Sequence, residues 1–334
     1  MGLMHAMFSS LASRYMFHPP ELPFYTLNEE EGSKKLKLRL RHILNPNIPS
    51  CKPEYLESLD IFKIRTKRRN DIVALYVKNP SASWTILYSH TNAEDLGVLL
   101  RDKSFRELSD DLGVNVMPSE KDTYADIEAA YGCLVDKYGA KEEDVILYGR
   151  SIGSGPTIDL ATRLPKLRGV VLESGITSVF RVASLAFCGV VSKRQSYSFD
   201  IYKNLEKIAL VSCPVVVIHG TDDEMVDLWH GEQLWSHSKY QYEPLWIEGG
   251  KHNDLDKYPQ FTEHLKKFVS DMEIESGYRR TSQRSRRGSA SSEEDQSSTK
   301  SLNVDQPEEQ TRNVNGKRFI SGRLLNCFKP ASTK

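Results

Sequence analysis

A serine between two glycines stands where a predicted strand meets a predicted helix. Residues 149–153 read Gly-Arg-Ser-Ile-Gly and follow the apolar run Val-Ile-Leu-Tyr of residues 145–148. In a nucleophile elbow the serine occupies a sharp turn between strand and helix, and the flanking glycines let these two elements approach each other. The pattern therefore predicts that Ser151 is a nucleophile whose hydroxyl projects beyond the edge of a sheet.

A serine hydroxyl attacks a carbonyl carbon only when a base accepts its proton and a carboxylate orients that base. Two later apolar runs supply these groups: Asp223 follows residues 214–218, and His252 follows residues 244–247. The carboxyl ends of parallel strands face one crevice, so the three side chains should meet at the same edge of the sheet. We therefore expect a catalytic triad of Ser151, His252 and Asp223.

Neighbouring polar residues are assigned structural roles. Asp223 is preferred as the acid because it stands where the loop is expected to turn back toward the crevice. Asp222 and Asp227 are expected to be solvated or to cap a helix, and His219 is interpreted as a structural residue.

Two backbone amides are predicted to bind the negatively charged oxygen of the reaction intermediate. The helix expected to begin at Ile152 offers free N–H groups and the positive end of its dipole, so the amide of Ile152 is the first donor. The second donor is placed at the backbone of Asn92, on the loop after residues 84–89. On the same loop His90 is interpreted as a hydrogen-bonded structural residue. Arg150 is expected to be solvated, with contact to an acidic flank of the substrate as the alternative.

The elements that must position these groups alternate along the chain. Residues 59–66 and 71–78 follow each other without a helix and predict an antiparallel hairpin. Further strands are predicted at residues 84–89, 114–117, 145–148, 169–172, 214–218 and 244–247. Helices are predicted at residues 93–112, 123–138, 152–163 and 259–275, the second with Asp122 or Thr123 as its N-cap. This alternation, with the order Ser, Asp, His, predicts an α/β-hydrolase fold: a mostly parallel central sheet with helices on both faces.

Composition divides the chain into three parts. Of its 334 residues, we assign 1–54 to an N-terminal amphipathic or irregular segment, 55–275 to the α/β domain and 276–334 to a disordered, basic, Ser-rich tail. The total charge is balanced, with 45 basic and 45 acidic residues, but residues 278–334 hold 12 Lys and Arg against 6 Asp and Glu. The balance argues against a nucleic-acid partner. The five cysteines are scattered, which indicates a reducing, cytoplasmic location and no zinc site, and no cofactor is implied.

Both ends of the chain carry patterns suited to membrane contact. Near the start, one helical face would lie in a bilayer interface or pack on the domain; it comprises Leu3, Met4, Met7, Phe8, Leu11 and Tyr15. In the tail, basic and apolar residues surround Cys327, a candidate palmitoylation site, although a solvated basic tail is the alternative. Ser282 and Ser289 follow paired arginines and are candidate phosphorylation sites.

Four separated motifs carry a resemblance to a known family. Residues 88–97, 147–156, 217–224 and 244–255 match, in order and spacing, the α/β-hydrolase domain-containing protein 17 family, which the chain resembles over about residues 17–271. The resemblance implies a serine hydrolase that removes S-acyl chains from cysteines of membrane-associated proteins, with Ser151, Asp223 and His252 as its triad. It also implies peripheral attachment to the cytosolic face of the plasma membrane or endosomes.

Two departures from the family pattern keep alternatives open. The family usually reads His-Gly-Asn where this chain has Thr91 between His90 and Asn92. A family loop that walls the active site is shortened here, so that Met117 meets Pro118 directly. The alternatives are a catalytically impaired α/β-hydrolase-like binding protein and, because triad chemistry is shared, a general carboxylesterase or serine peptidase-like hydrolase.

Overall fold

One large sheet runs through the centre of the computed structural model, which describes residues 24–29, 36–40, 59–77, 82, 84–92, 94, 96–100, 112–114, 120–183 and 200–272. Its eight strands lie in the order β10-β9-β8-β7-β5-β6-β4-β3. They are β3 (Leu59–Arg65), β4 (Asp71–Val77), β5 (Thr85–Ser89), β6 (Leu112–Val114), β7 (Val145–Arg150), β8 (Gly169–Glu173), β9 (Val215–Gly220) and β10 (Leu245–Ile247). Strand β4 pairs antiparallel with β3 and β6, and the other neighbours are parallel. The predicted hairpin is confirmed.

Strand β7 shows why the sheet is covered on both faces. Successive side chains of a strand point to opposite faces, and all four residues from Val145 to Tyr148 are buried. Val145 and Leu147 belong to an apolar cluster with Leu134 of helix α5 (Glu120–Tyr138), whereas Ile146 and Tyr148 belong to another with Phe268. A strand buried on both faces reads as a continuous apolar run, which is the pattern of residues 145–148.

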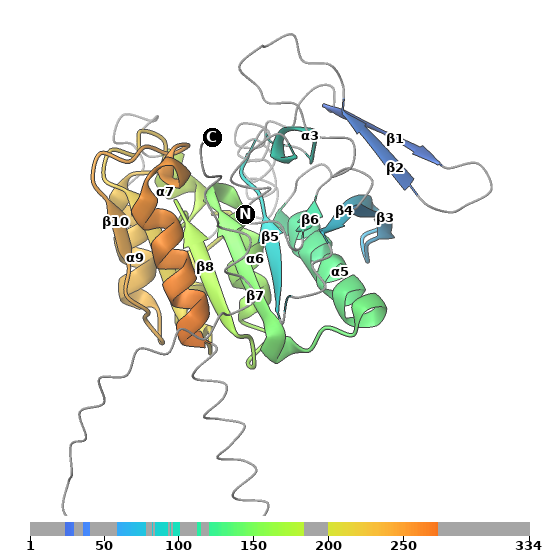
Figure 1. Ribbon diagram of the computed structural model, residues 1–334. Helices are drawn as coiled ribbons and strands as arrows, with labels where there is room; N and C mark the ends of the chain where they lie inside the picture. The colour runs from blue at the N-terminus through green and yellow to red at the C-terminus, as the bar shows by residue number, and fades with distance from the viewer. Residues whose placement is uncertain are drawn as a thin grey trace, which may run out of the picture.

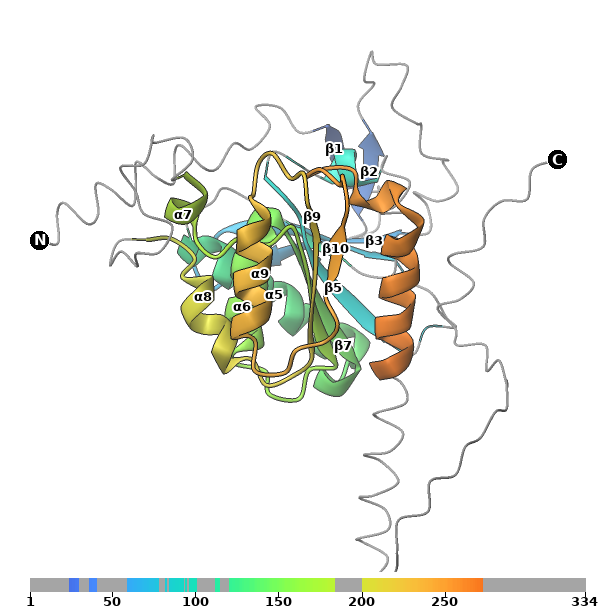
Figure 2. The same cartoon turned by 90° about the vertical axis from the view of Figure 1, so that its left-hand side faces the viewer.

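Helices form the two outer layers. Figure 2 shows α5, α6 (Ser154–Ala161), α8 (Asn204–Lys207) and α9 (Leu228–His237) on one face of the sheet and the orange helix over residues 259–272 on the other. Shorter helices, α3 (Leu96–Leu99) and α7 (Val179–Ala183), follow β5 and β8. The predicted α/β-hydrolase fold, with helices on both faces of a mostly parallel sheet, is confirmed. Within the described ranges, every helix is too short or too polar to cross a bilayer.

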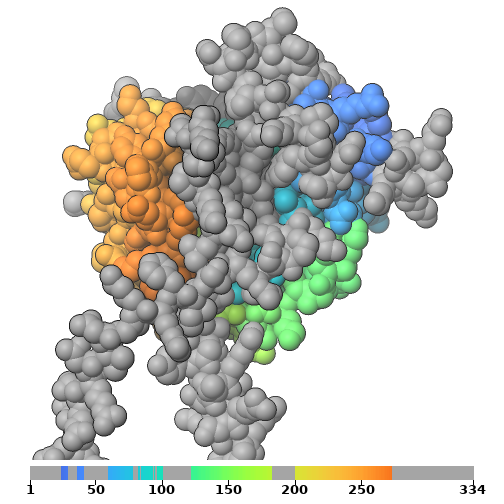
Figure 3. All heavy atoms as spheres, viewed as in Figure 1, coloured from blue at the N-terminus to red at the C-terminus, as the bar shows by residue number. Residues whose placement is uncertain are grey.

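A separate antiparallel hairpin, β1 (Tyr25–Glu29) and β2 (Leu36–Leu40), lies outside the main sheet (Figure 1). Figure 3 shows that its surface and that of α5 lie on the opposite side of the molecule from the surface of the helix over residues 259–272. The sequence did not predict this hairpin.

Two predicted helix boundaries are wrong. Leu112, assigned to a helix, begins strand β6 instead. Helix α5 begins at Glu120, before the predicted cap at Asp122 or Thr123. Asp122 lies inside the helix, and its carboxylate accepts hydrogen bonds from Arg68 and Asn70 on the turn between β3 and β4.

Candidate active site

The nucleophile elbow forms where β7 ends. Ser151 has a φ of 52°, a left-handed conformation that costs a non-glycine residue free energy, and the one-turn 3₁₀ segment Ser151–Gly153 leads into α6. A Cβ atom added to Gly153 would lie 2.1 Å from the carbonyl oxygen of Ser89. One added to Gly149 would lie 2.8 Å from the Cα atom of Ser154. The two glycines of the motif are therefore required by packing, because backbone atoms fill the space of any side chain.

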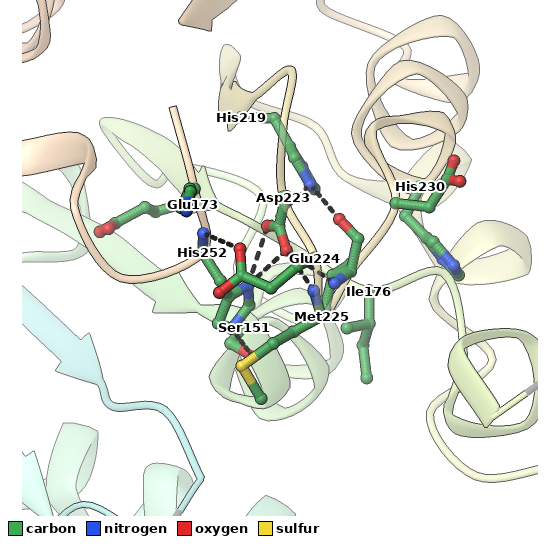
Figure 4. A network of polar contacts seen from close by, with 12 residues as sticks. Ser151, Glu173, Ile176, His219, Asp223, Glu224, Met225, His230 and His252 are labelled. Carbon is green, nitrogen blue, oxygen red and sulfur yellow. Dashed lines mark hydrogen bonds and ion pairs between the residues drawn. The ribbon is translucent and has the colours of Figure 1, made fainter. Parts of the chain in front are cut away.

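The structure brings the three predicted triad residues together (Figure 4). The Oγ atom of Ser151 lies 3.0 Å from Nε2 of His252, and Nδ1 of His252 lies 2.8 Å from Oδ2 of Asp223. They come from the segments after β7, β10 and β9, which end at the same edge of the sheet. Ser151 is 7% exposed and His252 is 2% exposed, so the reacting groups are largely shielded from water.

The carboxylate of Asp223 is held in its ionised form. Its Oδ1 atom accepts hydrogen bonds from the backbone amides of Met225 at 2.9 Å and Val226 at 2.7 Å. Burial opposes ionisation, but hydrogen bonds from His219 and His252, together with that from Val226, outweigh it and hold the pKa of Asp223 well below its usual range. An ionised Asp223 can fix the proton of His252 on Nδ1, which leaves Nε2 free to accept a proton from Ser151.

A second histidine contacts the same carboxylate, and the sequence interpretation did not foresee this. The side chain of His219 is fully buried, and its Nε2 atom lies 2.7 Å from the carbonyl oxygen of Val226 and 3.3 Å from Oδ2 of Asp223. A carbonyl only accepts, so we assign the proton of His219 to Nε2. Asp223 thus lies between two imidazoles (Figure 4). The spacing of four residues between His219 and Asp223, across the end of β9, is a signal that could have suggested the contact.

The remaining aspartates and His90 have the surroundings expected of structural residues. Asp227 caps helix α9 by accepting a hydrogen bond from the amide of Trp229 at 3.0 Å, and Asp222 is exposed. The Nδ1 atom of His90 lies 2.6 Å from the carbonyl oxygen of Thr91. Asp223 is therefore the aspartate of this loop that contacts His252.

The two predicted oxyanion donors lie on segments that pack together. Ile152 lies in the 3₁₀ segment of the elbow, and Asn92 lies on the loop after β5. The close approach of Gly153 to the carbonyl oxygens of Ser89 and His90 places that loop against the elbow. The assignment of the amides of Ile152 and Asn92 to the oxyanion hole stays a prediction.

Arg150 corrects one expectation. We expected a solvated side chain, but it is 11% exposed and its Nε atom forms an ion pair at 3.1 Å with Oε1 of Glu173, itself 6% exposed. The other carboxylate oxygen of Glu173 accepts a hydrogen bond of 2.5 Å from the hydroxyl of Tyr148. The arginine beside the nucleophile is therefore part of a buried polar network beside the elbow.

Several predicted features lie outside the described residues. These are Cys327, Ser282, Ser289, the apolar face of residues 3–15 and the junction of Met117 and Pro118. Among the residues that the structure describes, no group of His, Cys, Asp and Glu has an arrangement suited to a metal ion.

Comparison with known proteins identifies the family. The chain is 37% identical over 274 residues to alpha/beta hydrolase domain-containing protein 17B of Homo sapiens, covering 78% of this chain and 91% of that protein. It is 35% identical over 288 residues to protein 17C of Xenopus tropicalis, with 78% and 90% covered. The chain belongs to the α/β-hydrolase domain-containing protein 17 family. It is thus an α/β-hydrolase, as its resemblance to that family predicted.

Solved structures agree with this fold. An esterase of Pyrococcus furiosus superposes with a TM-score of 0.53 at 14% identity, covering 67% of this chain and 97% of the esterase. A second crystal form of that esterase gives a TM-score of 0.52 at 15% identity, covering 67% of this chain and 94% of the esterase. No family model matches the sequence.

Proposed function

We propose that this protein is a serine hydrolase that cleaves acyl thioesters and removes S-acyl chains, palmitoyl among them, from cysteines of membrane-associated proteins. The observation that carries the proposal is the continuous contact from Ser151 through His252 to Asp223, at 3.0 Å and 2.8 Å. Membership of the α/β-hydrolase domain-containing protein 17 family supports the hydrolase chemistry.

The reaction proceeds in two halves. His252 accepts the hydroxyl proton of Ser151 on Nε2 while Oγ bonds to the thioester carbon, and the negative oxygen is bound by the predicted amides of Ile152 and Asn92. The C–S bond then breaks, and the leaving cysteine sulfur takes the proton from His252. In the second half a water molecule gives a proton to His252 and attacks the acyl-enzyme, which releases the carboxylic acid and returns the proton to Ser151.

An apolar surrounding supports an acyl substrate. Ile152, adjacent to the nucleophile, packs against a cluster formed by Ile176, Val179, Ile201, Tyr202 and Val226. The backbone amide of Met225 donates a hydrogen bond to Asp223, yet Met225 is 53% exposed. A large apolar side chain is therefore exposed to solvent beside the triad. Burial of apolar surface on binding yields about 25 cal/mol per Å², which favours a long acyl chain over a short one.

We also propose that the protein works as a peripheral protein on the cytosolic face of the plasma membrane or endosomes, attached through the basic tail around Cys327 or through the apolar face near its start. Phosphorylation at Ser282 and Ser289 would reduce the positive charge of the tail and weaken this attachment. Deletion of residues 312–334 should move the protein to the soluble fraction, and unchanged membrane association would argue against attachment by the tail.

A fluorophosphonate probe tests the enzyme directly. The wild type should be labelled, and Ser151→Ala, which keeps the Cβ atom and the fold, should not be. Absence of labelling in folded wild type would favour the non-catalytic binding protein. Comparing turnover of an S-palmitoyl peptide with that of a short-chain ester then identifies the substrate class, since a general carboxylesterase would prefer the ester.

A further inference from the structure

The ion pair of Arg150 and Glu173 joins two strands at the edge that holds the triad. Arg150 is the last residue of β7 and directly precedes Ser151, and Glu173 is the last residue of β8. The two residues are register partners in the sheet, and the charged atoms lie 3.1 Å apart in a largely buried environment. Removing one partner of such a pair leaves an unpaired buried charge, so the two side chains hold each other in place.

The guanidinium of Arg150 also reaches the segment that carries the base. Its Nη2 atom lies 3.4 Å from Oδ1 of Asn253, the residue after His252. One side chain therefore contacts the residue that follows the base while its own backbone carries the nucleophile. The contact is long for a hydrogen bond, which makes it the weaker of the two links.

A third segment is linked by charge. Glu94 is buried on the loop after β5, the loop that holds Asn92. Burial lowers the pKa of Arg150, but the negative charges of Glu173 and Glu94 more than offset this and hold that pKa above its usual range. The guanidinium is thus a largely buried cation that contacts the end of β8 and the base segment, and its positive charge complements the negative charge of Glu94 on the oxyanion loop.

We propose that Arg150 is a positioning residue for hydrolysis: its ion pair with Glu173 and its contact with Asn253 hold the elbow of Ser151 in register with the segment of His252. The proposal rests on the proposed serine hydrolase function and extends it. A small displacement between nucleophile and base lowers kcat strongly, by about 100-fold for roughly 1 Å, whereas substrate binding elsewhere in the site is unaffected.

Arg168 provides a matched control. It is also a buried arginine, 6% exposed, and its Nη2 atom lies 3.1 Å from Oδ1 of Asp144. It precedes β8 and therefore lies at the opposite, amino edge of the sheet. A variant at Arg168 removes the ion pair of a buried arginine with a partly exposed aspartate, without touching the triad.

The experiment compares Arg150→Met, Arg150→Lys, Glu173→Gln, the double variant Arg150→Met with Glu173→Gln, and Arg168→Met. Turnover of a short-chain p-nitrophenyl ester is measured below the lowest melting temperature of the set. We expect Arg150→Met to lower kcat about 10- to 100-fold at unchanged KM. Arg150→Lys, which keeps the positive charge but loses the planar guanidinium with its several N–H donors, should retain part of the activity. The double variant should be no worse than Arg150→Met, because Glu173→Gln removes only the ion pair that Arg150→Met has already removed. Arg168→Met should keep the wild-type kcat.

The low-field proton NMR signal of the His252 to Asp223 hydrogen bond gives a readout that is independent of turnover. Arg150→Met should shift or broaden this signal, and Arg168→Met should leave it unchanged. A wild-type kcat in Arg150→Met, or an equal loss of kcat in Arg168→Met, would overturn the proposal. If the wild type proves inactive and unlabelled by the probe, the proposed function fails, and an unchanged NMR signal in Arg150→Met then overturns the positioning role as well.

Discussion

The two edges of the sheet each bury an arginine against a carboxylate, with different surroundings. At the amino edge, Arg168 pairs with Asp144, donates to the carbonyl oxygen of Met272 at 3.0 Å and stacks over Trp84 at 4.9 Å. These contacts fasten the helix over residues 259–272 to the sheet. At the carboxyl edge, Arg150 and Glu173 lie directly beside a hydroxyl that contacts an imidazole. The same ion-pair chemistry thus serves anchoring at one edge and, in our proposal, alignment at the other.

The two edges also differ in backbone strain. Ser151 and Ser174, with φ of 52° and 47°, follow the carboxyl ends of β7 and β8. Non-glycine residues in this conformation cost free energy and persist only where the surroundings hold them. The strain at Ser151 has an evident use, because the turn that causes it points the hydroxyl toward His252. We therefore expect changes at the carboxyl edge to reduce activity first, and changes at the amino edge to reduce stability alone.

The largest expected effect is that of Asp223→Asn. An amide in place of the carboxylate can donate to Nδ1 of His252, which favours the tautomer with the proton on Nε2 and removes the base that Ser151 needs. We expect kcat to fall roughly 1,000- to 10,000-fold, measured as ester turnover. If kcat of the folded variant falls by less than 10-fold, then turnover at the carboxyl edge does not require the carboxylate of Asp223.

The same variant changes stability in acid. The pKa of Asp223 is lowered in the folded protein, so the unfolded chain binds the proton first, near pH 3.9. The carboxylate therefore stabilises the fold above about pH 4, and this contribution is lost as the pH falls from there through the folded pKa. Chemical denaturation at pH 5 and pH 3 should show a smaller acid-induced loss in Asp223→Asn than in the wild type. An equal loss in both would contradict the assigned shift.

The crowding of the elbow can be measured by comparing a glycine substitution in the elbow with one in helix α5. The Cβ atom of Gly153→Ala would meet the carbonyl oxygen of Ser89 at 2.1 Å, so the backbone must shift. We expect the free energy of unfolding to drop by ~3 kcal/mol, with loss of ester turnover. Gly132→Ala in α5 is the control, because nothing lies within 4 Å of its added Cβ. That variant should gain about 0.5–1 kcal/mol in thermal or chemical denaturation, and a comparable loss at both positions would remove the contrast.

Much of the sheet and the triad was predictable because local sequence patterns mark the ends of the strands. The apolar run before Gly149 and the pair Gly249 and Gly250 before His252 mark strand ends, and parallel strands bring those ends together. Helix α9 was missed because Gly231, a residue of low helix propensity, stands in its middle. The fold shows why a glycine is needed at this position: a Cβ atom on Gly231 would lie 2.7 Å from Nδ1 of His219.

Side-chain partners across the sheet were the least predictable part. Arg150 and Glu173 are separated by 23 positions, and only the register of β7 against β8 makes them neighbours. An arginine beside a nucleophile reads as exposed in a linear pattern, because long charged side chains are rarely buried unless paired. Pairing with Glu173 is what allows Arg150 to be buried, and this pairing exists only in the folded protein.

The smallest expected effect concerns His219. Its Nε2 atom donates mainly to the carbonyl oxygen of Val226 and only at 3.3 Å to Asp223, so its removal should disturb the acid without abolishing it. We expect His219→Phe, which keeps the ring shape and loses the donor, to lower kcat about 10-fold at unchanged KM. This corresponds to about 1.4 kcal/mol, near the lower end of the range for a hydrogen bond to a charged group.

His219→Gln separates the donor from the packing of the ring. Its amide nitrogen reaches approximately the position of Nε2, so this variant should stay within about 3-fold of the wild-type kcat if the hydrogen bond is what matters. If Gln is impaired and Phe is not, the role of His219 lies in filling the space beside Gly231. In that case the second imidazole belongs with Arg168 among the groups that stabilise the fold, although it contacts the acid at the carboxyl edge.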